Sequence, residues 1–352
     1  MSSSPTVTGW ELNRALLARQ LLLERARLPL PRALERIGGI QNQYAPNAYI
    51  RLWSCVDGFE RGSLTRALER RSLVQASLRR GTIHVVSARD YRLFASGIRR
   101  GRRGWWERVH RPHSERVDLA AAEAALRASL AGTTRTRDEI VEVLRPFDPP
   151  GARPNLAWSG VDVDLVRVPP SGTWERRRAS LFALADDWLG PADASEEEGL
   201  RHLARRYLGA FGPARCNDLA DWAGLPPAFF AGVLGEMRLR RFRDESGREL
   251  LDLPRGLLPD PETAAGIRFL PTWDATLLVH ARRTGILPET YRPRIFSTKM
   301  PQSIGTFLVD GVVAGTWRHE HGRIEVEPFG KLPQATRREV DEEAERLAAF
   351  HA

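Results

Sequence analysis

Two glutamines separated by one residue, Gln41 and Gln43, are the residues of this 352-residue chain whose types and spacing best suit a chemical reaction. In an extended or turn segment, residues i and i+2 face the same side, so both carboxamides can hold one water molecule. A carboxamide donates and accepts hydrogen bonds but takes no proton at neutral pH, so this pair suits only a substrate with a good leaving group. The alternative is structural: the amides cap a helix end or satisfy buried backbone groups.

The densest basic and aromatic stretch is residues 99–106. Arginines can contact phosphates while a tryptophan stacks on a base or adduct, so this stretch predicts DNA contacts. The residues that we expect to make them are Arg99, Arg100, Arg102 and Arg103. The alternative is a solvated linker with Trp105 or Trp106 buried beneath it.

Two histidines, His319 and His321, lie at the tip of a predicted hairpin, from which they can enter a DNA groove. An ordinary exposed turn is the alternative. Neither this pair nor His110 with His113 has further ligands at zinc-binding spacing. We therefore predict no metal and no cofactor.

The charge of the chain favours a nucleic-acid partner. Lys plus Arg total 53 against 44 for Asp plus Glu, and only Lys299 and Lys331 are lysines, which leaves 51 arginines. Guanidinium groups bind phosphate oxygens in pairs, so a basic chain rich in arginine suits DNA. A genome rich in G and C, which favours arginine codons over lysine codons, is the other explanation.

Composition excludes several classes of protein. No apolar run approaches the roughly 18 residues of a membrane span, and the first residues lack the pattern of a secretory signal. Two cysteines are too few for a disulfide framework and suit a reducing compartment. We expect a cytoplasmic protein with no membrane association.

The elements that must position the glutamines follow from hydrophobic spacing. Residues 10–27, 32–37 and 48–56 are predicted helices, and residues 73–79 and 82–87 are predicted strands joined at Arg80–Gly81. Three helices and a hairpin are the pattern of a winged helix. On its hairpin we expect Arg79, Arg80 and His84 to contact the DNA backbone.

The same order recurs twice. Helices at 196–211, 216–223 and 227–237 precede strands at 238–243 and 249–253, which gives another winged helix. Residues 118–130, 136–144 and 161–168 read as a divergent copy between the two.

After residue 261 the chain turns to short strands at 267–270, 306–309, 312–318 and 323–328, and a helix at 337–350 follows. The predicted fold is therefore α+β: three tandem winged-helix domains and a small C-terminal β-barrel-like subdomain, C-shaped around a basic concave channel. The predicted domains are residues 1–98 (first winged helix with the Gln-x-Gln loop), 99–190 (linker and divergent second winged helix), 191–260 (third winged helix) and 261–352 (β subdomain and C-terminal helix).

Several segments carry a family signature, in order along the chain. The first is Gly-Ile-Gln-Asn-Gln at 39–43, followed by Ala-Tyr-Ile-Arg-Leu-Trp at 48–53. The others are residues 78–86, 172–179, 211–214 with 218–225, and 270–274 through 282–283. Together they resemble the AlkZ/YcaQ family of bacterial winged-helix DNA glycosylases. Each motif is weak alone, but their order over about 300 residues makes the resemblance fairly specific.

The resemblance implies removal of alkylated bases from double-stranded DNA, and in the AlkZ-like branch removal of bulky adducts or interstrand cross-links left by antibiotics. Gln41 and Gln43 match the catalytic pair, and a glutamine at the second position resembles the AlkZ type. Asn42 departs from the usual apolar middle residue. We expect a monomer without an obligate protein partner.

The expected reaction is hydrolysis at a cationic N7-alkylguanine. The positive charge on the purine weakens the glycosidic bond, so fixed neutral dipoles suffice to orient water and stabilise the sugar cation. Neither Lys299 nor Lys331 lies near the glutamines in sequence, which favours a monofunctional enzyme without a Schiff base.

Two other classes of function suit the same sequence. A winged-helix transcription regulator would bind a specific sequence and release no base. A protein-interaction scaffold would bind its partner without the steep salt dependence of phosphate contacts.

Overall fold

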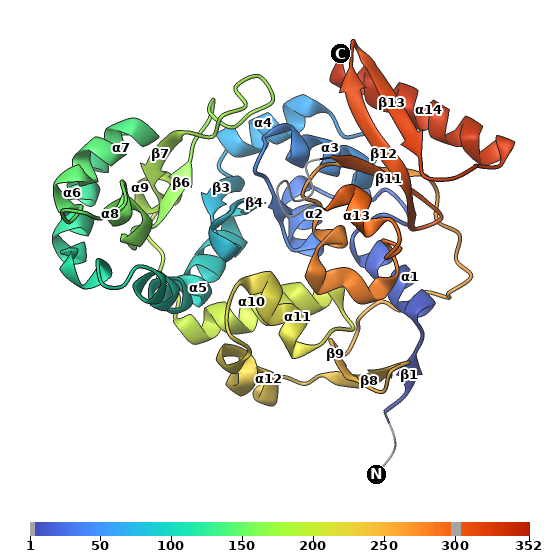
Figure 1. Ribbon diagram of the computed structural model, residues 1–352, viewed down its shortest axis with the longest axis horizontal. Helices are drawn as coiled ribbons and strands as arrows, with labels where there is room; N and C mark the ends of the chain where they lie inside the picture. Colours follow the sequence, from blue (N-terminus) through green and yellow to red (C-terminus); the bar gives the residue numbers. More distant parts are fainter. Residues whose placement is uncertain (1–3, 297–303) are drawn as a thin grey trace.

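The computed structural model describes residues 4–296 and 304–352, and Lys299 lies outside them. Three units with the same order of elements fill most of the chain (Figure 1). In the first unit a helix is followed by a short strand, two helices and a hairpin: α2 (Leu30–Ile37), β2 (Ile40–Gln41), α3 (Pro46–Cys55), α4 (Arg61–Glu69), β3 (Leu73–Ser77) and β4 (Ile83–Ser87).

The middle unit repeats this order. Its elements are α6 (Leu119–Leu130), β5 (Arg135–Thr136), α7 (Arg137–Leu144), α8 (Leu156–Gly160), β6 (Leu165–Arg167) and β7 (Leu181–Leu184). Thr136 caps α7 through a capping box with Glu139, which explains why this helix begins where the sequence predicts. A short helix, α9 (Ala185–Leu189), leads out of the unit.

The third unit has the same plan, with a single bridge between Ala214 and Leu251 in the place of the short strand. Its elements are α10 (Glu196–Phe211), α11 (Cys216–Ala223), α12 (Ala231–Glu236), β8 (Arg240–Asp244) and β9 (Glu249–Asp252). In all three units the short strand or bridge pairs with the last strand of the hairpin.

One prediction about the first unit is wrong. Residues 10–27 were expected to supply its first helix, but α1 (Gly9–Arg19) is shorter, and β1 (Thr6–Val7) just before it pairs with β8 of the third unit. The third helix of the first unit is α4. Only Leu64 and Leu68 of α4 are buried, so its hydrophobic pattern is too sparse to be recognised in the sequence.

The first and middle units share one sheet. Its strand order is β2-β4-β3-β6-β7-β5, and β3 pairs with β6 at Gln75 and Arg167. The order is the same from either edge: short strand, last strand, first hairpin strand. The two units are therefore joined through corresponding strands, with the middle unit at the left of Figure 1.

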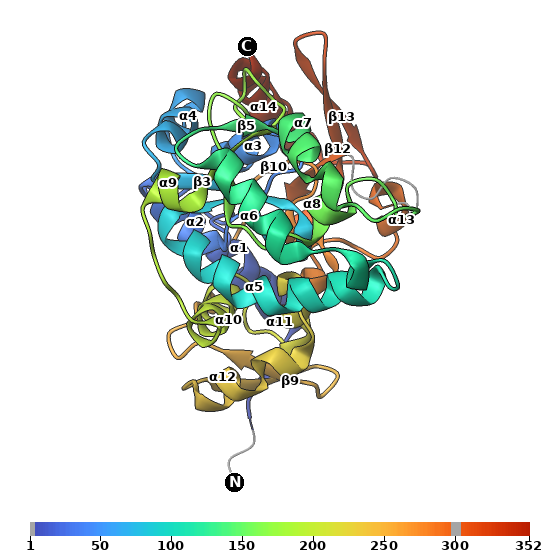
Figure 2. The same cartoon turned by 90° about the vertical axis from the view of Figure 1, so that its left-hand side faces the viewer.

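A long helix, α5 (Ala88–Val109), connects the first unit to the middle one and runs across the view of Figure 2. The predicted domain boundary at 98–99 falls inside this helix, and the segment expected as a linker is helical. Helices α5 and α10 approach so closely at Gly97 and Gly199 that a Cβ on Gly199 would lie 2.3 Å from the backbone nitrogen of Gly97. Both glycines are needed for this crossing.

The C-terminal part is an open antiparallel sheet, ordered β10-β11-β12-β13, at the upper right of Figure 1 with the C-terminal helix. Its elements are β10 (Arg268–Leu270), β11 (Gly305–Val309), β12 (Val312–Glu320), β13 (Arg323–Pro328) and α14 (Gln334–His351), with a short helix α13 (Arg292–Ile295) before β11. Within the described residues, β13 pairs with β12 alone. The expected barrel-like closure is therefore absent there, although the predicted strands are confirmed.

We predict that Gly199→Ala lowers the free energy of unfolding by about 1–3 kcal/mol, because its new methyl group meets backbone rather than a flexible side chain. Gly104→Ala, in α5 rather than α10, is the control: nothing lies within 4 Å of its Cβ position, so helix propensity should leave stability equal or higher by up to about 1 kcal/mol. Urea denaturation with unchanged slope measures both effects. Equal midpoints for the two variants would contradict the close crossing.

Candidate active site

Gln41 lies where α2 ends and β2 begins. Gly38 and Gly39 both have φ of +80°, and a Cβ on Gly39 would come within 2.7 Å of the Val86 side chain, so the turn requires glycine. The turn pairs β2 with β4, which places Gln41 opposite His84. Only 7% of Gln41 is exposed.

Gln43 follows in an exposed loop. Its side chain continues the hydrogen bonding between β2 and β4 by accepting from the backbone of β4. The backbone N–H of Asn42 donates to the Ile83 carbonyl at 2.7 Å, and the N–H of Ile83 donates to Gln43 Oε1 at 2.8 Å. The structural alternative, that an amide satisfies a backbone group, is thus realised at Gln43. Because a carboxamide oxygen has two lone pairs, one remains free for a further hydrogen bond.

Asn42, the residue that departs from the family pattern, is buried between the two glutamines. Its Oδ1 accepts a hydrogen bond from the N–H of Ala48 in the first turn of α3, at 3.1 Å. Its Nδ2 donates to Gln75 Oε1 at 3.2 Å. Asn42 therefore ties the loop to α3 and β3, and a polar middle residue is consistent with an ordered loop.

Arg80 holds the Gln41 carboxamide. It occupies the left-handed region at the tip of the hairpin, with φ of +53°. Its Nη2 donates to Gln41 Oε1 at 2.7 Å, and its Nη1 donates to the carbonyl of Trp222 in α11 at 2.8 Å. Burial lowers the pKa of this guanidinium, which still stays charged at neutral pH. Within the described part of the chain no carboxylate pairs with it.

A small hollow of about 10 Å³ lies beside Gln41, lined also by Arg51, Trp273 and Asp274. Arg51 Nε pairs with Asp274 Oδ2 at 2.9 Å, and both side chains are buried. Among the described residues, the buried Nη1 of Arg51 has no hydrogen-bond partner. The hollow has room for about one water molecule, to which the unpaired Nη1 of Arg51 can donate a hydrogen bond.

Comparison with known proteins assigns the chain to a family. A family model described as DNA glycosylase AlkZ-like matches residues 34–350. The chain belongs to the AlkZ-like DNA glycosylase family. The sequence-based expectation of an enzyme, a DNA glycosylase, is therefore confirmed, and the alternative of a regulator that releases no base is not favoured.

The curated match and the solved structure that this AlkZ-like glycosylase resembles both come from Streptomyces sahachiroi. The interstrand DNA cross-link repair glycosylase of that organism is 23% identical over 371 residues, which cover 97% of this chain and 95% of the relative. The solved structure of Streptomyces sahachiroi DNA glycosylase AlkZ superposes with a TM-score of 0.80 at 19% identity, covering 98% and 97% of the two chains. The mixed α+β architecture is thereby confirmed.

Two residues predicted to contact the DNA backbone lie in the interior of the glycosylase. Arg79 is 2% exposed: its guanidinium lies 3.8 Å from the centroid of the Trp222 ring and donates to the Gly38 carbonyl. His84 is 1% exposed, and its Nδ1 lies 3.0 Å from the carbonyl of Thr82. Burial lowers the pKa of both well below the ordinary value. The prediction for these two is wrong, because neither presents a surface to a phosphate.

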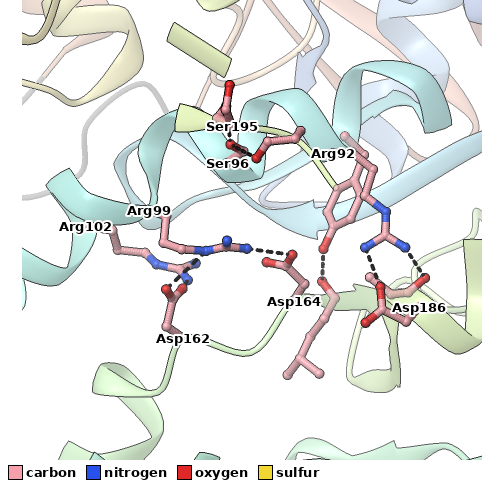
Figure 3. A network of polar contacts seen from close by, with 12 residues as sticks. Arg92, Ser96, Arg99, Arg102, Asp162, Asp164, Asp186 and Ser195 are labelled. Carbon is pink, nitrogen blue, oxygen red and sulfur yellow. Dashed lines mark hydrogen bonds and ion pairs between the residues drawn. The ribbon is translucent and has the colours of Figure 1, made fainter. Parts of the chain in front are cut away.

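The arginines of α5 form ion pairs with carboxylates, which the sequence did not predict. Figure 3 shows Arg99 and Arg102 turned toward the carboxylates of Asp162 and Asp164 in the middle unit. Arg103 pairs with Glu123 at 2.6 Å, and Arg100 pairs with Glu196 at 2.7 Å. These ion pairs connect α5 to the middle unit and to the start of α10. Arg99 and Arg100 still expose 44% and 66% of their side chains, and contact of the four arginines with DNA stays a prediction.

The predicted hairpin histidines are exposed, as expected. His319 lies near the end of β12 and stacks on His351 of α14, with ring centroids 4.3 Å apart. His321 occupies the turn, with φ of +50°. Their contact with DNA stays a prediction.

In the described residues, no three His, Cys, Asp or Glu side chains gather in a way that could hold a metal ion. Likewise, none of the described helices has the length and apolar composition needed to cross a bilayer. The residues that sequence reasoning missed are Arg51 and Asp274. Asp274 falls in a family-like motif, but only the tertiary contact with Arg51 places it beside Gln41.

We predict that Arg80→Ala slows release of N7-methylguanine from duplex DNA at least tenfold, because Gln41 loses the charged donor that fixes its carboxamide. Arg80→Lys, which keeps the charge without the two-pronged contact, should be intermediate. The measurement is a single-turnover excision assay. Arg338→Ala, an exposed arginine of α14 with no partner among the described residues, is the control, and equal rates for Arg80→Ala and Arg338→Ala would remove Arg80 from the site.

Proposed function

We propose that this AlkZ-like glycosylase hydrolyses the N-glycosidic bond of cationic, bulky N7-alkylguanine adducts in double-stranded DNA. The proposal includes interstrand cross-links of the kind that genotoxic antibiotics leave, for self-resistance or base excision repair. The observation that carries it is the uncharged Gln41 carboxamide, fixed by Arg80 beside a hollow with room for about one water. The relative described as an interstrand DNA cross-link repair glycosylase supports the inclusion of cross-links.

The chemistry matches the side chains. When the bond between C1′ and N9 breaks, its electron pair goes to the purine and neutralises the positive charge that N7 alkylation created. Water then forms a bond to C1′ and loses a proton to solvent. Since the base leaves without protonation, the enzyme has to orient water and stabilise the sugar cation, which neutral dipoles can do.

The two amides would act from fixed orientations. The Arg80 donor identifies the Gln41 atom beside it as the oxygen, and the Ile83 N–H does the same for Gln43. Each oxygen retains one lone pair for a water proton, and each NH₂ group is left to donate. No hydrogen bond between the described atoms joins the two amides, so the substrate and its water would connect them.

We also propose that the three repeated units are winged helices, followed by the C-terminal sheet and helix, and that the chain is arranged as a C-shape around a basic concave channel. The proposed DNA contacts are Arg80, Arg99, Arg100, Arg102, Arg103, His319 and His321. The repeated pairing of the short strand with the last hairpin strand supports the winged-helix assignment. We propose a monomeric enzyme.

We predict that Gln41→Ala and Gln43→Ala each lower the excision rate of N7-methylguanine by a factor of about 10² to 10⁴, while affinity for the lesion duplex changes little, because the amides act on water rather than on the phosphates. Gel analysis of abasic sites measures excision, and fluorescence polarisation measures affinity. The Gln43→Glu variant tests whether a carboxylate, acting as a general base, is tolerated at this position. Full excision by the double alanine variant would exclude the pair from the mechanism.

A second prediction concerns the charge of the lesion. Duplexes carrying N7-methylguanine should lose the base, whereas matched duplexes with undamaged guanine or a neutral damaged base should lose little or none, because a carboxamide cannot assist a poor leaving group. Mass spectrometry of the released bases provides the comparison. Equal release of a neutral lesion would show that another group activates the leaving base.

A further inference from the structure

A hollow of about 660 Å³ lies between α2, the start of α5, α10 and the segment that follows β9. None of its lining residues also lines the small hollow at Gln41, and none is a proposed DNA contact. In Figure 2, α2, α10 and the beginning of α5 lie toward the left, whereas the hairpin of β12 and β13 lies toward the right. The hollow is therefore separate from the glutamine site.

Two buried carboxylates hold some of the cations at this hollow. Asp90 Oδ1 accepts from Nε and Nη2 of Arg206 at 3.0 and 2.7 Å, and it lies 2.7 Å from Nε2 of His202. Glu35, which is 8% exposed, pairs with Arg206 at 3.2 Å and with Arg32 at 3.0 Å. Both carboxylates are therefore engaged and leave the other cations of the hollow without a counter-charge.

Four further arginines line the hollow, each on a different segment. They are Arg36 of α2, Arg89 of α5, Arg205 of α10 and Arg255 after β9. All four are exposed, and none has a hydrogen bond or an ion pair within the described residues. Glu35 is the one acidic residue among the described residues of the lining. Like charges around one concave surface repel one another and raise the local concentration of anions.

A buried ion pair fixes the segment that carries Arg255. Arg19 pairs with both carboxylate oxygens of Asp252, at 2.7 and 2.9 Å, and both side chains are buried. The same guanidinium donates to the Leu257 carbonyl at 3.0 and 2.7 Å. The backbone around Arg255 is thus already ordered, so a ligand that binds its guanidinium need not order the loop.

The lining of the hollow suits linked phosphate groups. A guanidinium binds phosphate oxygens in pairs, and a single phosphate monoester offers three acceptor oxygens, which are too few for four guanidiniums. No Trp, Tyr or Phe is among its described lining residues, so a nucleobase has no ring on which to stack. The volume of the hollow is within the range of small-molecule sites.

We propose that this hollow is an anion site, distinct from the glutamine site, that binds a chain of linked phosphate groups. Such a chain has two sources: a free polyphosphate, or the backbone of a DNA segment that lies away from the lesion. The proposal goes beyond the proposed function and does not depend on which base the glycosylase releases.

The test is isothermal titration calorimetry of the whole protein with inorganic tripolyphosphate at low salt. The double variant Arg36→Gln with Arg205→Gln should weaken binding at least about tenfold, because two charge-assisted donors are lost. The control is Arg127→Gln with Arg338→Gln, which removes the same charge from exposed arginines of α6 and α14 outside the hollow. Its affinity should stay within about twofold of that of the unaltered protein.

An undamaged DNA duplex in the same titration separates the two sources of phosphate. If DNA enters the hollow, the duplex displaces tripolyphosphate, and the Arg36 and Arg205 double variant lowers the salt dependence of duplex binding more than the control does, by about 0.9 in the slope for each lost phosphate contact. If the source is a free polyphosphate, tripolyphosphate and the duplex bind together. Either result supports a phosphate site in this hollow.

Three results would overturn the proposal: no binding of tripolyphosphate by the unaltered protein, equal weakening in the two double variants, or equal binding of an oligo-glutamate of the same charge. Thermal unfolding followed by circular dichroism checks the fold, and both double variants should melt close to the unaltered protein because the replaced side chains are exposed. Excision of N7-methylguanine is measured separately, so its absence would count against the proposed function and leave the phosphate site decided by calorimetry.

Discussion

A buried ion pair between Arg51 of α3 and Asp274, after β10, joins the glutamine-bearing unit to the C-terminal sheet. The same guanidinium donates to the backbone and side chain of Gln20, so three segments meet on one cation. Removal of one partner from such a pair typically costs about 3–5 kcal/mol because a buried charge is left alone. Both residues also line the hollow at Gln41, so this pair holds part of its wall.

Arginine performs two different tasks in this chain. Arg79, Arg99, Arg102 and Arg103 are used within the protein, either beneath an aromatic ring or against a carboxylate. Arg80 instead donates to two neutral acceptors and forms no ion pair among the described residues, although the nearby Asp221 acts on its charge. This guanidinium is our proposed contact for a DNA phosphate. Net charge therefore describes the attraction of the whole molecule for DNA, while the pairing of each guanidinium decides where contact can occur.

The two groups that we propose to act on the substrate, the Gln41 and Gln43 carboxamides, are neutral, and this suits the proposed cationic substrate. A carboxylate beside the sugar would serve a reluctant leaving group, but the buried Asp274 already accepts hydrogen bonds from Thr276 and pairs with Arg51. The glutamines remain as oriented dipoles beside the small hollow. Under the proposed function, the chemical reactivity resides in the alkylated base and the protein supplies position.

The sequence by itself determined the family, the α+β class, most helices and strands, and the glutamine pair, because these follow from local spacing, capping residues and short motifs. It could not show that β3 and β6 join two units in one sheet, that α1 belongs beside the third unit, or that Arg79 and His84 turn inward while Arg80 turns to Gln41. Neighbouring residues on one hairpin have similar sequence signals, and only the packing of α11 and α2 against that hairpin decides which side chain is buried. Arg51 and Asp274 likewise belong to segments more than two hundred residues apart, and no local pattern records their contact.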